Sequence, residues 1–569
     1  MDPVRERRWR LREADETAVA SVARGAGTPE LLARLLVNRG IIDVAAAEQF
    51  LNATLSGCHD PFLLHGMKEA VERLAAARQT GEMVCVYGDY DVDGITATAI
   101  LIEFFRSVGI ACFYHIPNRM EDGYGLAEAG VRAAASGGAR IIVSVDCGVT
   151  ALAEAELCRL LGIDLIITDH HTPGKIVPDA HAVINPTLPA CTFPFKLLAG
   201  VGVAFNLLIA LRTRLRTAGA FTGGEAPNLR EYLDLVTLGT IADIVPLTDE
   251  NRLLVRYGLK ELTAARRPGI AALKTVAGVT REVSCYDVGF RLAPRLNACG
   301  RLEDATRGVE LLLCRDPEEA AVIAGELDAA NNERRQIEQE ILREAIELLE
   351  SEEKELSGIV LSSPSWHPGV IGIVASRIVE RYHRPTILIA LMEGVGRGSG
   401  RSIPSFHLYE ALAACSGNLQ KFGGHKYAAG LSIAEERLTP FAEEFDAHAA
   451  ALLTAEELLP ELLIDAELNP EEISSALPAL VARLEPFGAG NPAPLFLLRR
   501  AAVLNRWVLK EKHLKLRLAL PSGVVDAIAF NRADFGCADT VDLIFSPEIN
   551  IWNGRESLQL KIRDIRNSG

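Results

Sequence analysis

Acidic residues and histidines at four places along the chain are of types that could together hold a metal ion. The four places are the motifs GDYDVDG, SVDCG, ITDHH and LGTIADIVPL. The residues concerned are Asp89, Asp91, Asp93, Asp146, Asp169, His170, His171 and Asp243. So many carboxylates gathered at one point would repel one another unless a cation lay among them. Oxygen ligands with a few imidazoles suit Mn²⁺ or Mg²⁺, and the sulfur-rich spacing of a structural zinc site is absent from the sequence.

The elements that must position these residues read as alternating strands and helices. The strand-like runs are MVCVYGD (83–89), IIVSVD (141–146) and DLIITD (164–169), and the helical ones are ITATAILIEFFRSVG (95–109) and ALAEAELCRLLG (151–162). This alternation predicts a parallel, doubly wound α/β sheet with right-handed crossovers. The carboxyl ends of its strands form one rim, which is the usual place for a ligand site in such a sheet.

The motif GDYDVDG also has a purely structural interpretation. One aspartate between a strand and a helix is usually an N-cap that accepts hydrogen bonds from unpaired helix amides. Three aspartates at alternate positions exceed what capping needs, and they would share one side if the strand geometry continued. Gly88 and Gly94 allow tight turns at the two ends of the motif. For this motif taken alone, a cap and a metal site both stay open.

The residues of the other motifs also have structural interpretations. Asp146 could be a second cap, and a single histidine after a strand would more often be a packing residue. Two adjacent histidines after an aspartate are harder to explain structurally, and their side chains diverge. We therefore expect one imidazole on a metal and the other facing a substrate phosphate. Asp243 lies in a mostly apolar segment, where a buried carboxylate needs a cation or a network of donors.

Length, composition and charge restrict the class of protein. The 569 residues are too many for one core, and 49% of them are hydrophobic, so we expect two to four globular domains. The charged N-terminus lacks a signal-peptide core, no apolar stretch reaches the roughly 18 residues of a membrane span, and the 11 cysteines form no CxxC pair. These features predict a soluble, cytoplasmic protein. The net charge is −16, yet residues 495–569 hold 12 Lys and Arg against 8 Asp and Glu, so a local basic face can still bind phosphates.

Changes in composition along the chain predict its domains. The predicted fold is α/β, with a parallel-sheet domain and a smaller α/β domain joined by a long charged helix, followed by a C-terminal β-barrel of the OB type. The predicted boundaries are 1–60 for an N-terminal helical segment, 61–315 for the metal-binding domain, 316–357 for the helix, 358–460 for the second α/β domain and 461–569 for the barrel.

Candidates for phosphate and nucleic-acid binding lie mostly in the second half. GRGSGRSI and FGGHKYAAG combine glycine amides with Ser399, Arg401, Gly424 and His425, although most glycine-rich segments are simply turns. From residue 506 to residue 517, basic side chains interleave with Trp507, which suits single-strand binding without sequence preference. The alternative for any one of these residues is a solvated strand face with a buried tryptophan. PFGAGNPAP (486–494) is interpreted as the loop that leads into this module.

These motifs resemble a known family. GDYDVDG, the strand end at Asp146 and TDHH look like the signature of the DHH phosphoesterase superfamily. IPNRMEDGYGL, LGTIADIVPL, RLNACGRL and FGGHKYAAG extend the resemblance to its single-strand-specific 5′→3′ DNA exonucleases of bacteria, from about residue 60 to the end. Arg119, Arg295 and Arg301 stand in these motifs as candidate phosphate ligands. Their alternative is an ordinary salt bridge to the acidic cluster.

The resemblance implies an activity and its residues. It implies hydrolysis of the phosphodiester nearest the 5′ end of single-stranded DNA to 5′-mononucleotides, in DNA repair and recombination. Two Mn²⁺ or Mg²⁺ ions would be bound by Asp89, Asp91, Asp93, Asp146, His170 and Asp243, with Asp146 bridging. The catalytic set would be Asp91, Asp93, Asp146, His170, His171 and Asp243, where His171 binds or polarises the scissile phosphate. DNA would be bound by Arg119, Arg295, Arg301, Ser399, Arg401, Gly424, His425, Trp507, Lys512 and Lys515.

Polarity and strand selection follow from the same resemblance. Arginines of the second α/β domain would hold the 5′-terminal phosphate, and a cleft too narrow for a duplex would select single strands. The expected partner is single-stranded DNA, with a single-strand-binding protein and a RecQ-type helicase as candidate protein partners, no membrane, and a monomeric state.

Two alternatives are weighed against this interpretation. A single-strand-binding protein with a decayed active site would have lost metal ligands, and none is lost in this sequence. A phosphatase or oligonucleotidase of the same superfamily, acting on very short substrates, would need neither this length nor the basic C-terminal module.

Overall fold

The fold is described from a computed structural model that covers residues 6–118, 125–221, 226–302, 305–351, 354–552 and 554–569. These residues form two compact units. The N-unit comprises Asp15–Asn331 and Ala476–Ala493, and the C-unit comprises the described part of Met1–Ala14 with Asn332–Ser475 and Pro494–Gly569.

A five-stranded parallel sheet lies at the centre of the N-unit, in the order β3-β2-β4-β5-β6. Its strands are β2 (Met83–Tyr87), β3 (Cys112–His115), β4 (Ala139–Val145), β5 (Asp164–Thr168) and β6 (Ala182–Ile184). The chain leaves β2 toward β3 and leaves β4 toward β5, so the direction of winding reverses between the adjacent strands β2 and β4. In an open α/β sheet, this reversal point at the carboxyl ends of the strands is where a ligand binds. The predicted parallel α/β sheet is therefore confirmed.

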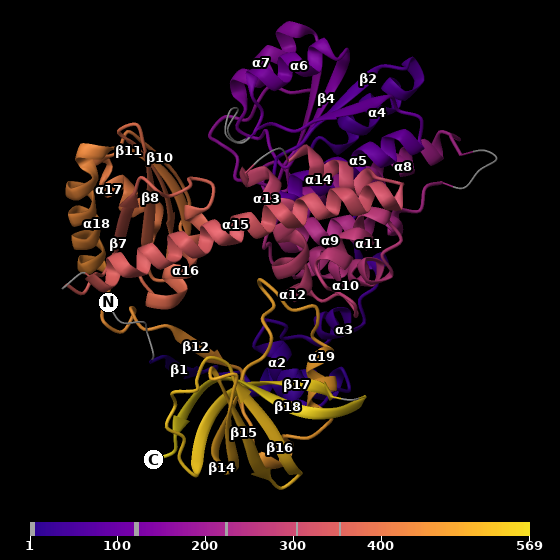
Figure 1. Ribbon diagram of the computed structural model, residues 1–569. Coiled ribbons are helices and arrows are strands. Elements are labelled where there is room, and N and C mark those ends of the chain that lie inside the picture. The colour runs from indigo at the N-terminus through magenta and orange to yellow at the C-terminus, as the bar shows by residue number, and fades with distance from the viewer. Residues whose placement is uncertain (1–5, 119–124, 222–225, 303–304, 352–353, 553) are drawn as a thin grey trace. The chain divides into compact units, whose positions relative to one another are not determined.

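Helices cover both faces of this sheet (Figure 1). Helices α6 and α7 contact each other on β4 and β5, while α4, α5 and α8 pack together. The helices up to α9 are α1 (Glu16–Gly25), α2 (Glu30–Val37), α3 (Val44–Asn52), α4 (Met67–Thr80), α5 (Val92–Ser107), α6 (Glu128–Ser136), α7 (Leu152–Leu161), α8 (Gly200–Thr217) and α9 (Leu233–Ala242). Helix α5 is buried on nearly every side, which its apolar sequence ITATAILIEFF makes possible.

A second layer of helices packs on α5 and α9. It consists of α10 (Asp249–Ala264), α11 (Pro268–Val276), α12 (Cys285–Asp287), the π-helix η4 (Val288–Leu292), α13 (Ala293–Leu302) and α14 (Thr306–Leu313). Residues 476–493, with α19 (Leu477–Ala482), return to this layer from the far end of the chain. PFGAGNPAP is therefore not simply the expected loop leading into the barrel. Most of it packs in the N-unit, because its carbonyl and amide groups pair with residues there.

Helix α15 (Pro317–Ser351) is the predicted long helix, and the division between the units falls within it, at Asn331 and Asn332. In the C-unit its residues Ile341, Ala345 and Leu349 are buried against α16 (Ile371–Tyr382) and β7 (Ile359–Ser363). The sheet there has the order β10-β11-β9-β8-β7. The other strands of this sheet are β8 (Thr386–Met392), β9 (Val395–Arg401), β10 (Lys421–Gly424) and β11 (Ala428–Ala434). The helices α17 (Leu408–Ala414) and α18 (Leu438–Leu452) belong to the same part of the C-unit.

Five long strands close into the C-terminal barrel, because β14 pairs with both β15 and β17. They are β14 (Phe496–Leu509), β15 (His513–Leu520), β16 (Gly523–Ala529), β17 (Thr540–Trp552) and β18 (Arg555–Asn567). The predicted barrel is confirmed. One strand was not expected in the N-terminal segment, β1 (Arg8–Leu11), which pairs in parallel with β12 (Glu461–Ile464). A short strand, β13 (Ala466–Glu467), joins β14.

Two further observations concern the whole described chain. The 11 cysteines are free thiols. No described helix has the length and apolar character that a membrane crossing requires.

Candidate metal centre

The turn after β2 holds the first three aspartates, but not in extended geometry. The strand ends at Tyr87 and α5 begins at Val92, so Asp93 lies in the first helical turn. Asp91 is the N-cap, and its Oδ1 accepts hydrogen bonds from the N–H groups of Asp93 (2.9 Å) and Gly94 (3.2 Å). A Cβ on Gly94 would lie 2.6 Å from the backbone of Asp89, so only glycine allows this turn to fold back on itself. The capping role considered for the motif is thus real, and it falls to Asp91.

Asp93 is held by the beginning of a distant helix. It is 1% exposed, and its carboxylate accepts hydrogen bonds from the N–H groups of Gly200 (2.6 Å) and Val201 (2.8 Å). These amides belong to the first turn of α8, where unpaired N–H groups and the helix dipole favour a negative charge. Nothing in the sequence pattern predicted this support, since the contact joins residues more than 100 positions apart.

Asp146 follows β4 and has a backbone φ of +62°, which is unusual for a residue other than glycine. Its N–H donates to the carbonyl of Thr168, so the strand pairing extends to this residue. A Cβ on Gly200 would lie 2.6 Å from Asp146 Oδ1, and therefore only glycine at the start of α8 lets that helix approach. Helix α8 thus brings Asp93 and Asp146 together.

The three side chains of the Asp-His-His motif after β5 have different roles. Asp169 accepts hydrogen bonds from the N–H groups of Val149 (2.9 Å), His170 (2.7 Å) and His171 (3.0 Å), and it lies 2.8 Å from His171 Nδ1. This carboxylate therefore shapes the turn and orients His171. Asp169 was counted among the acidic residues that could hold a metal ion, but its role in orienting His171 was not predicted.

His170 points to the centre of the acidic cluster. Its Nε2 lies 3.1 Å from Asp146 Oδ1, 3.6 Å from Asp243 Oδ2 and 3.9 Å from Asp93 Oδ2. Three overlapping groups each offer ligand atoms within 4.8 Å of one another: Asp89 with Asp91 and Asp146, Asp93 with His170 and Asp243, and Asp146 with His170 and His171. The structure therefore brings the six predicted metal ligands and His171 to one place.

Burial and mutual repulsion dominate the electrostatics of this cluster. Burial, followed by the charge of Asp91, raises the pKa of Asp93 to about 7. Burial and the charges of Asp93 and Asp91 raise the pKa of Asp243 to about 9. The pKa of Asp146 is also raised well above its usual value by burial and by its acidic neighbours. In the absence of a cation, protonation of these aspartates offsets their mutual repulsion, as expected for a site that holds cations.

The pKa values of the two histidines shift in opposite directions. Burial and then the charge of His171 lower the pKa of His170 to about 4, so this imidazole is neutral and can act as a metal ligand. Burial also acts to lower the pKa of His171, but the hydrogen bond and charge of Asp169 outweigh it and raise that pKa. Within the described chain, the buried atoms His170 Nε2 and Asp243 Oδ2 form no hydrogen bond. An imidazole nitrogen and a carboxylate oxygen left in this way, beside further carboxylates, fit a divalent cation such as Mn²⁺ or Mg²⁺.

Helix α13 supports the turn that carries Asp89, Asp91 and Asp93. Asn297 Oδ1 accepts a hydrogen bond from the Val92 N–H (3.1 Å), and a Cβ on Gly300 would lie 2.5 Å from the Tyr90 carbonyl oxygen. Both residues belong to the motif RLNACGRL, in which only the arginines were singled out. The motif was the right signal, and its asparagine was missed.

The three arginines predicted to bind DNA in this unit have different outcomes. Arg119 and the side chain of Arg301 lie outside the described residues. Arg295 is buried, and its guanidinium donates to Asp328 (2.8 Å) and to the carbonyls of Arg291 and Val276. This geometry favours the salt-bridge alternative for Arg295, with Asp328 of α15 as the partner in place of the acidic cluster.

In the C-unit, Ser399 and Arg401 lie beside the beginning of α16. A Cβ on Gly372 would lie 2.8 Å from Ser399 Oγ and 3.1 Å from an Arg401 guanidinium nitrogen. Arg401 also donates to Ser399 Oγ (3.2 Å). A helix N-terminus with a hydroxyl and a guanidinium is a favourable place for an anion. Gly424, at the end of β10, has a φ of +140°, and His425 is exposed in the turn that follows it.

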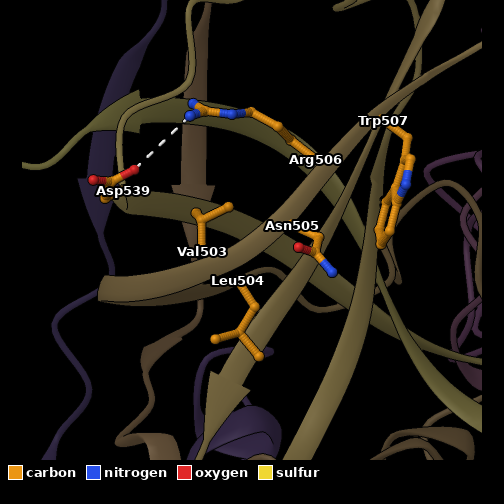
Figure 2. A pocket seen from close by; sticks show the side chains of 6 residues that line it. All are labelled: Val503, Leu504, Asn505, Arg506, Trp507 and Asp539. Atoms are coloured by element: carbon orange, nitrogen blue, oxygen red, sulfur yellow. Dashed lines mark ion pairs between the residues drawn. The ribbon is translucent and has the colours of Figure 1, made fainter.

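On the barrel, the predicted basic and aromatic residues lie on β14 and β15. Trp507 is 39% exposed, and the Arg517 guanidinium lies 5.3 Å from its ring centre. Lys515 and Arg517 both pair with Asp526, whereas Lys512 is exposed in the turn between the strands. Arg506, Trp507 and Asp539 help to line a neighbouring hollow of about 360 Å³. Figure 2 shows Arg506 reaching toward Asp539 on one side of it and Trp507 on the other.

An apolar groove of about 520 Å³ begins next to Asp243. Ala242 and Ile244, its neighbours in sequence, both line the groove. Three large apolar side chains in it are unusually exposed: Ile244 (75%), Tyr286 (59%) and Phe290 (59%). The rings of Tyr286 and Phe290 stack at 4.7 Å, and Phe290 belongs to the π-helix η4, a kind of element often found at functional sites. Exposed apolar side chains gathered in one groove are typical of a binding site, and sequence reasoning missed this groove.

Comparison with family models places three domains along the chain. Residues 83–240 match the DHH family N-terminal domain, residues 355–451 match the DHHA1 domain, and residues 464–564 match the RecJ OB domain. The resemblance to the DHH superfamily that the motifs suggested is thus confirmed.

Individual relatives match over nearly the whole chain. The single-stranded-DNA-specific exonuclease RecJ of Escherichia coli strain K12 is 42% identical, with 98% of each sequence covered. The crystal structure of RecJ from Thermus thermophilus in complex with Mn²⁺ is 34% identical, with a TM-score of 0.84, and covers 99% of this chain and 80% of that one. The Mg²⁺ complex of the same protein is similar, with a TM-score of 0.78 and 32% identity, covering 99% of this chain and 79% of that one.

Proposed function

Because the chain belongs to the RecJ family of single-stranded-DNA-specific exonucleases, we propose that it hydrolyses single-stranded DNA from the 5′ end to 5′-mononucleotides. The observation that carries this proposal is the cluster at the rim of the N-unit sheet. It gathers seven side chains of types that bind metal ions. Two of their buried atoms, His170 Nε2 and Asp243 Oδ2, lack hydrogen-bond partners within the described chain. A cluster of this kind has a use in phosphodiester hydrolysis, where charge must be offset at the reacting phosphate.

Two neighbouring groups of residues would hold the metal ions. One is Asp89 with Asp91 and Asp146, and the other is Asp93 with His170 and Asp243. Mn²⁺ or Mg²⁺ bound there supplies a nucleophilic water at neutral pH and offsets the negative charge of the phosphate. Asp146 is the candidate bridging ligand, because it lies in the first group and its Oδ1 is 3.1 Å from His170 Nε2 of the second.

His171 is the residue proposed to contact the scissile phosphate. Its Nδ1 is committed to Asp169, so Nε2 is the ring nitrogen that can reach a substrate. The raised pKa of His171 favours the protonated ring, which donates a charge-assisted hydrogen bond to a phosphate oxygen. Asp169 would hold the ring in the orientation that this contact requires.

Single-stranded DNA fits the remaining surfaces better than a small substrate does. Stacked aromatic rings beside the metal centre and an exposed tryptophan on the barrel both suit unpaired bases. Ser399 and Arg401 beside the beginning of α16 suit a terminal phosphate, whose capture would set the 5′→3′ polarity. A single-strand-binding protein and a RecQ-type helicase stay predictions as protein partners.

The test is a nuclease assay with Mn²⁺ on 5′-labelled single-stranded, duplex and dinucleotide substrates. We expect mononucleotides to leave the 5′ end of the single strand, and Asp146→Ala to reduce kcat by at least about 1,000-fold. The matched control is Asp164→Ala, because Asp164 begins the strand β5 far from its carboxyl end and pairs with Arg73. Cleavage of the dinucleotide alone would point to an oligonucleotidase, and binding without cleavage would point to a binding protein.

A further inference from the structure

A buried asparagine joins two segments that lead to the metal centre. Asn251, in the first turn of α10, is 0% exposed. Its Nδ2 donates to the carbonyl of Leu197 (2.6 Å) and to the carbonyl of Pro246 (3.0 Å). The two carbonyls belong to separate segments of the chain, and a single buried amide group donates to both.

Each of these carbonyls lies three residues from a contact with the metal centre. Leu197 precedes Gly200, whose N–H donates to Asp93. Pro246 follows Asp243, and the loop between them is short. Asp93 and Asp243 are also the two carboxylates of one ligand group, and their oxygens lie 3.9 Å and 3.6 Å from His170 Nε2. The asparagine therefore ties together the supports of both carboxylates.

The loop after Asp243 requires such support. Ile244 has a φ of +62°, an unfavourable conformation for a β-branched residue, which persists only where the surroundings impose it. Two hydrogen bonds hold this loop on its far side, one from Asn251 to the Pro246 carbonyl and one from the Leu247 N–H to the Ala489 carbonyl (2.7 Å). Without them the chain can relax, and the Asp243 carboxylate moves with it.

We propose that Asn251 is a positioning residue that sets the separation of Asp93 and Asp243 and so determines how tightly their ion is held. The inference rests on the proposed metal-dependent function. The two hydrogen bonds that Asn251 donates support the loops of Leu197 and Pro246 and not the turn of Asp89 and Asp91. The start of α8 also packs against Asp146, so the ion of that other group has one affected ligand, against two for the ion of Asp93 and Asp243, and it is affected less. The expected signature is unequal weakening of two metal sites by one substitution.

The test is a titration of the full chain with Mn²⁺ in the absence of DNA, for the wild type and Asn251→Ala. The paramagnetic resonance signal of the free ion measures how much Mn²⁺ stays unbound at each step. We expect one of two bound ions to be weakened roughly 10- to 100-fold, the usual range for residues that orient metal ligands. The other ion should change by less than about threefold. In the nuclease assay, kcat should fall while KM for single-stranded DNA stays constant, and excess Mn²⁺ should restore part of the rate.

Asn206→Ala is the matched control. Asn206 is also a buried asparagine, and its Nδ2 donates to the Gly202 carbonyl (3.0 Å) within α8 and lies 3.5 Å from Glu250, but it does not join the two loops. Both variants should lose thermal stability, whereas only Asn251→Ala should lose metal affinity. If the alanine variant does not fold, Asn251→Ser keeps one donor, and the same comparison is made with it.

The outcomes separate this inference from the proposed function. Unchanged Mn²⁺ binding in the Asn251 variant, or equal weakening of both ions, would overturn the positioning role. A wild-type chain that binds two Mn²⁺ ions and cleaves no single-stranded DNA would defeat the proposed function, while the binding data would still decide the role of Asn251. A wild-type chain that binds no Mn²⁺ would overturn both.

Discussion

The rim of the N-unit sheet and the barrel place their polar side chains in opposite environments. At the rim, Asp93 and Asp146 are almost fully buried, and Asp93 and Asp169 are fixed by backbone N–H groups. On the barrel, Trp507 and Lys512 are exposed, and the charges near them pair with aspartates at the surface. Chemistry at one phosphate requires fixed groups in a site with little water, whereas binding without sequence preference requires accessible rings and cations.

The comparison is tested most strongly at a rim residue that is not itself a proposed metal ligand. Asp169→Asn keeps the shape of the side chain but removes the charge that orients His171 and raises its pKa. We expect kcat for single-stranded DNA to fall roughly 10- to 100-fold with little change in KM. Asp446→Asn is the control, since Asp446 is a buried carboxylate of the C-unit that also accepts two backbone N–H groups. Equal losses in both variants would mean that burial alone, and not the position at the rim, determines the effect.

The groove beside Asp243 shares properties with both regions, because it combines exposed rings with proximity to the metal centre. Replacing Tyr286 and Phe290 by alanine together should raise KM for single-stranded DNA roughly 5- to 100-fold, the range for losing one stacked base. Phe62→Ala, which removes an exposed aromatic ring of the N-unit outside the groove, should leave KM unchanged. A normal KM in the double variant would show that the DNA takes another path.

Barrel variants should have smaller effects, confined to binding of long strands. Trp507→Ala should raise KM for long single-stranded DNA a few-fold, roughly 5- to 10-fold, and leave cleavage of a trinucleotide unchanged. Lys512→Ala should reduce the slope of log affinity against log salt concentration by about 0.7, the value for one phosphate contact with a single strand. A fall in kcat in either variant would contradict the division of tasks between rim and barrel.

The smallest expected effect is on the pH dependence of stability without metal. The pKa is about 7 for Asp93 and about 9 for Asp243, whereas an unfolded aspartate has a pKa near 4. The folded state therefore retains protons between about pH 4 and pH 9 that the unfolded state has released, and the free energy of unfolding falls as pH rises. In a chelator, the melting temperature should fall by a few degrees between pH 5 and pH 9, and less in Asp93→Asn. Mn²⁺ should counteract this fall, and a melting temperature that rises with pH in the chelator would contradict the assigned shifts.

The sequence predicted the site residues that stand in local motifs, and it missed those that act through contacts with residues far away in the sequence. Asp89, Asp146 and the histidine pair follow short apolar strands, so local pattern was enough to find them. The helical position of Asp93 was missed, because strand and helix meet within four residues and alternation looks extended in both interpretations. Gly200, Asn251 and Asn297 act through contacts between residues far apart in sequence, which no local pattern reveals. The groove was missed for the same reason, since its rings come from segments that look like ordinary core.

The return of residues 476–493 to the N-unit has a consequence for the order in which the chain is made. Ala489 accepts a hydrogen bond from Leu247, the Glu485 carbonyl accepts one from the buried Arg252, and Asn491 accepts one from Arg39. These partners are synthesised more than 200 residues earlier than the segment that completes them. During translation, every candidate metal ligand has therefore left the ribosome long before the loop after Asp243 gains its last support. A chain cut after residue 475 would keep all those ligands and permanently resemble that unfinished state.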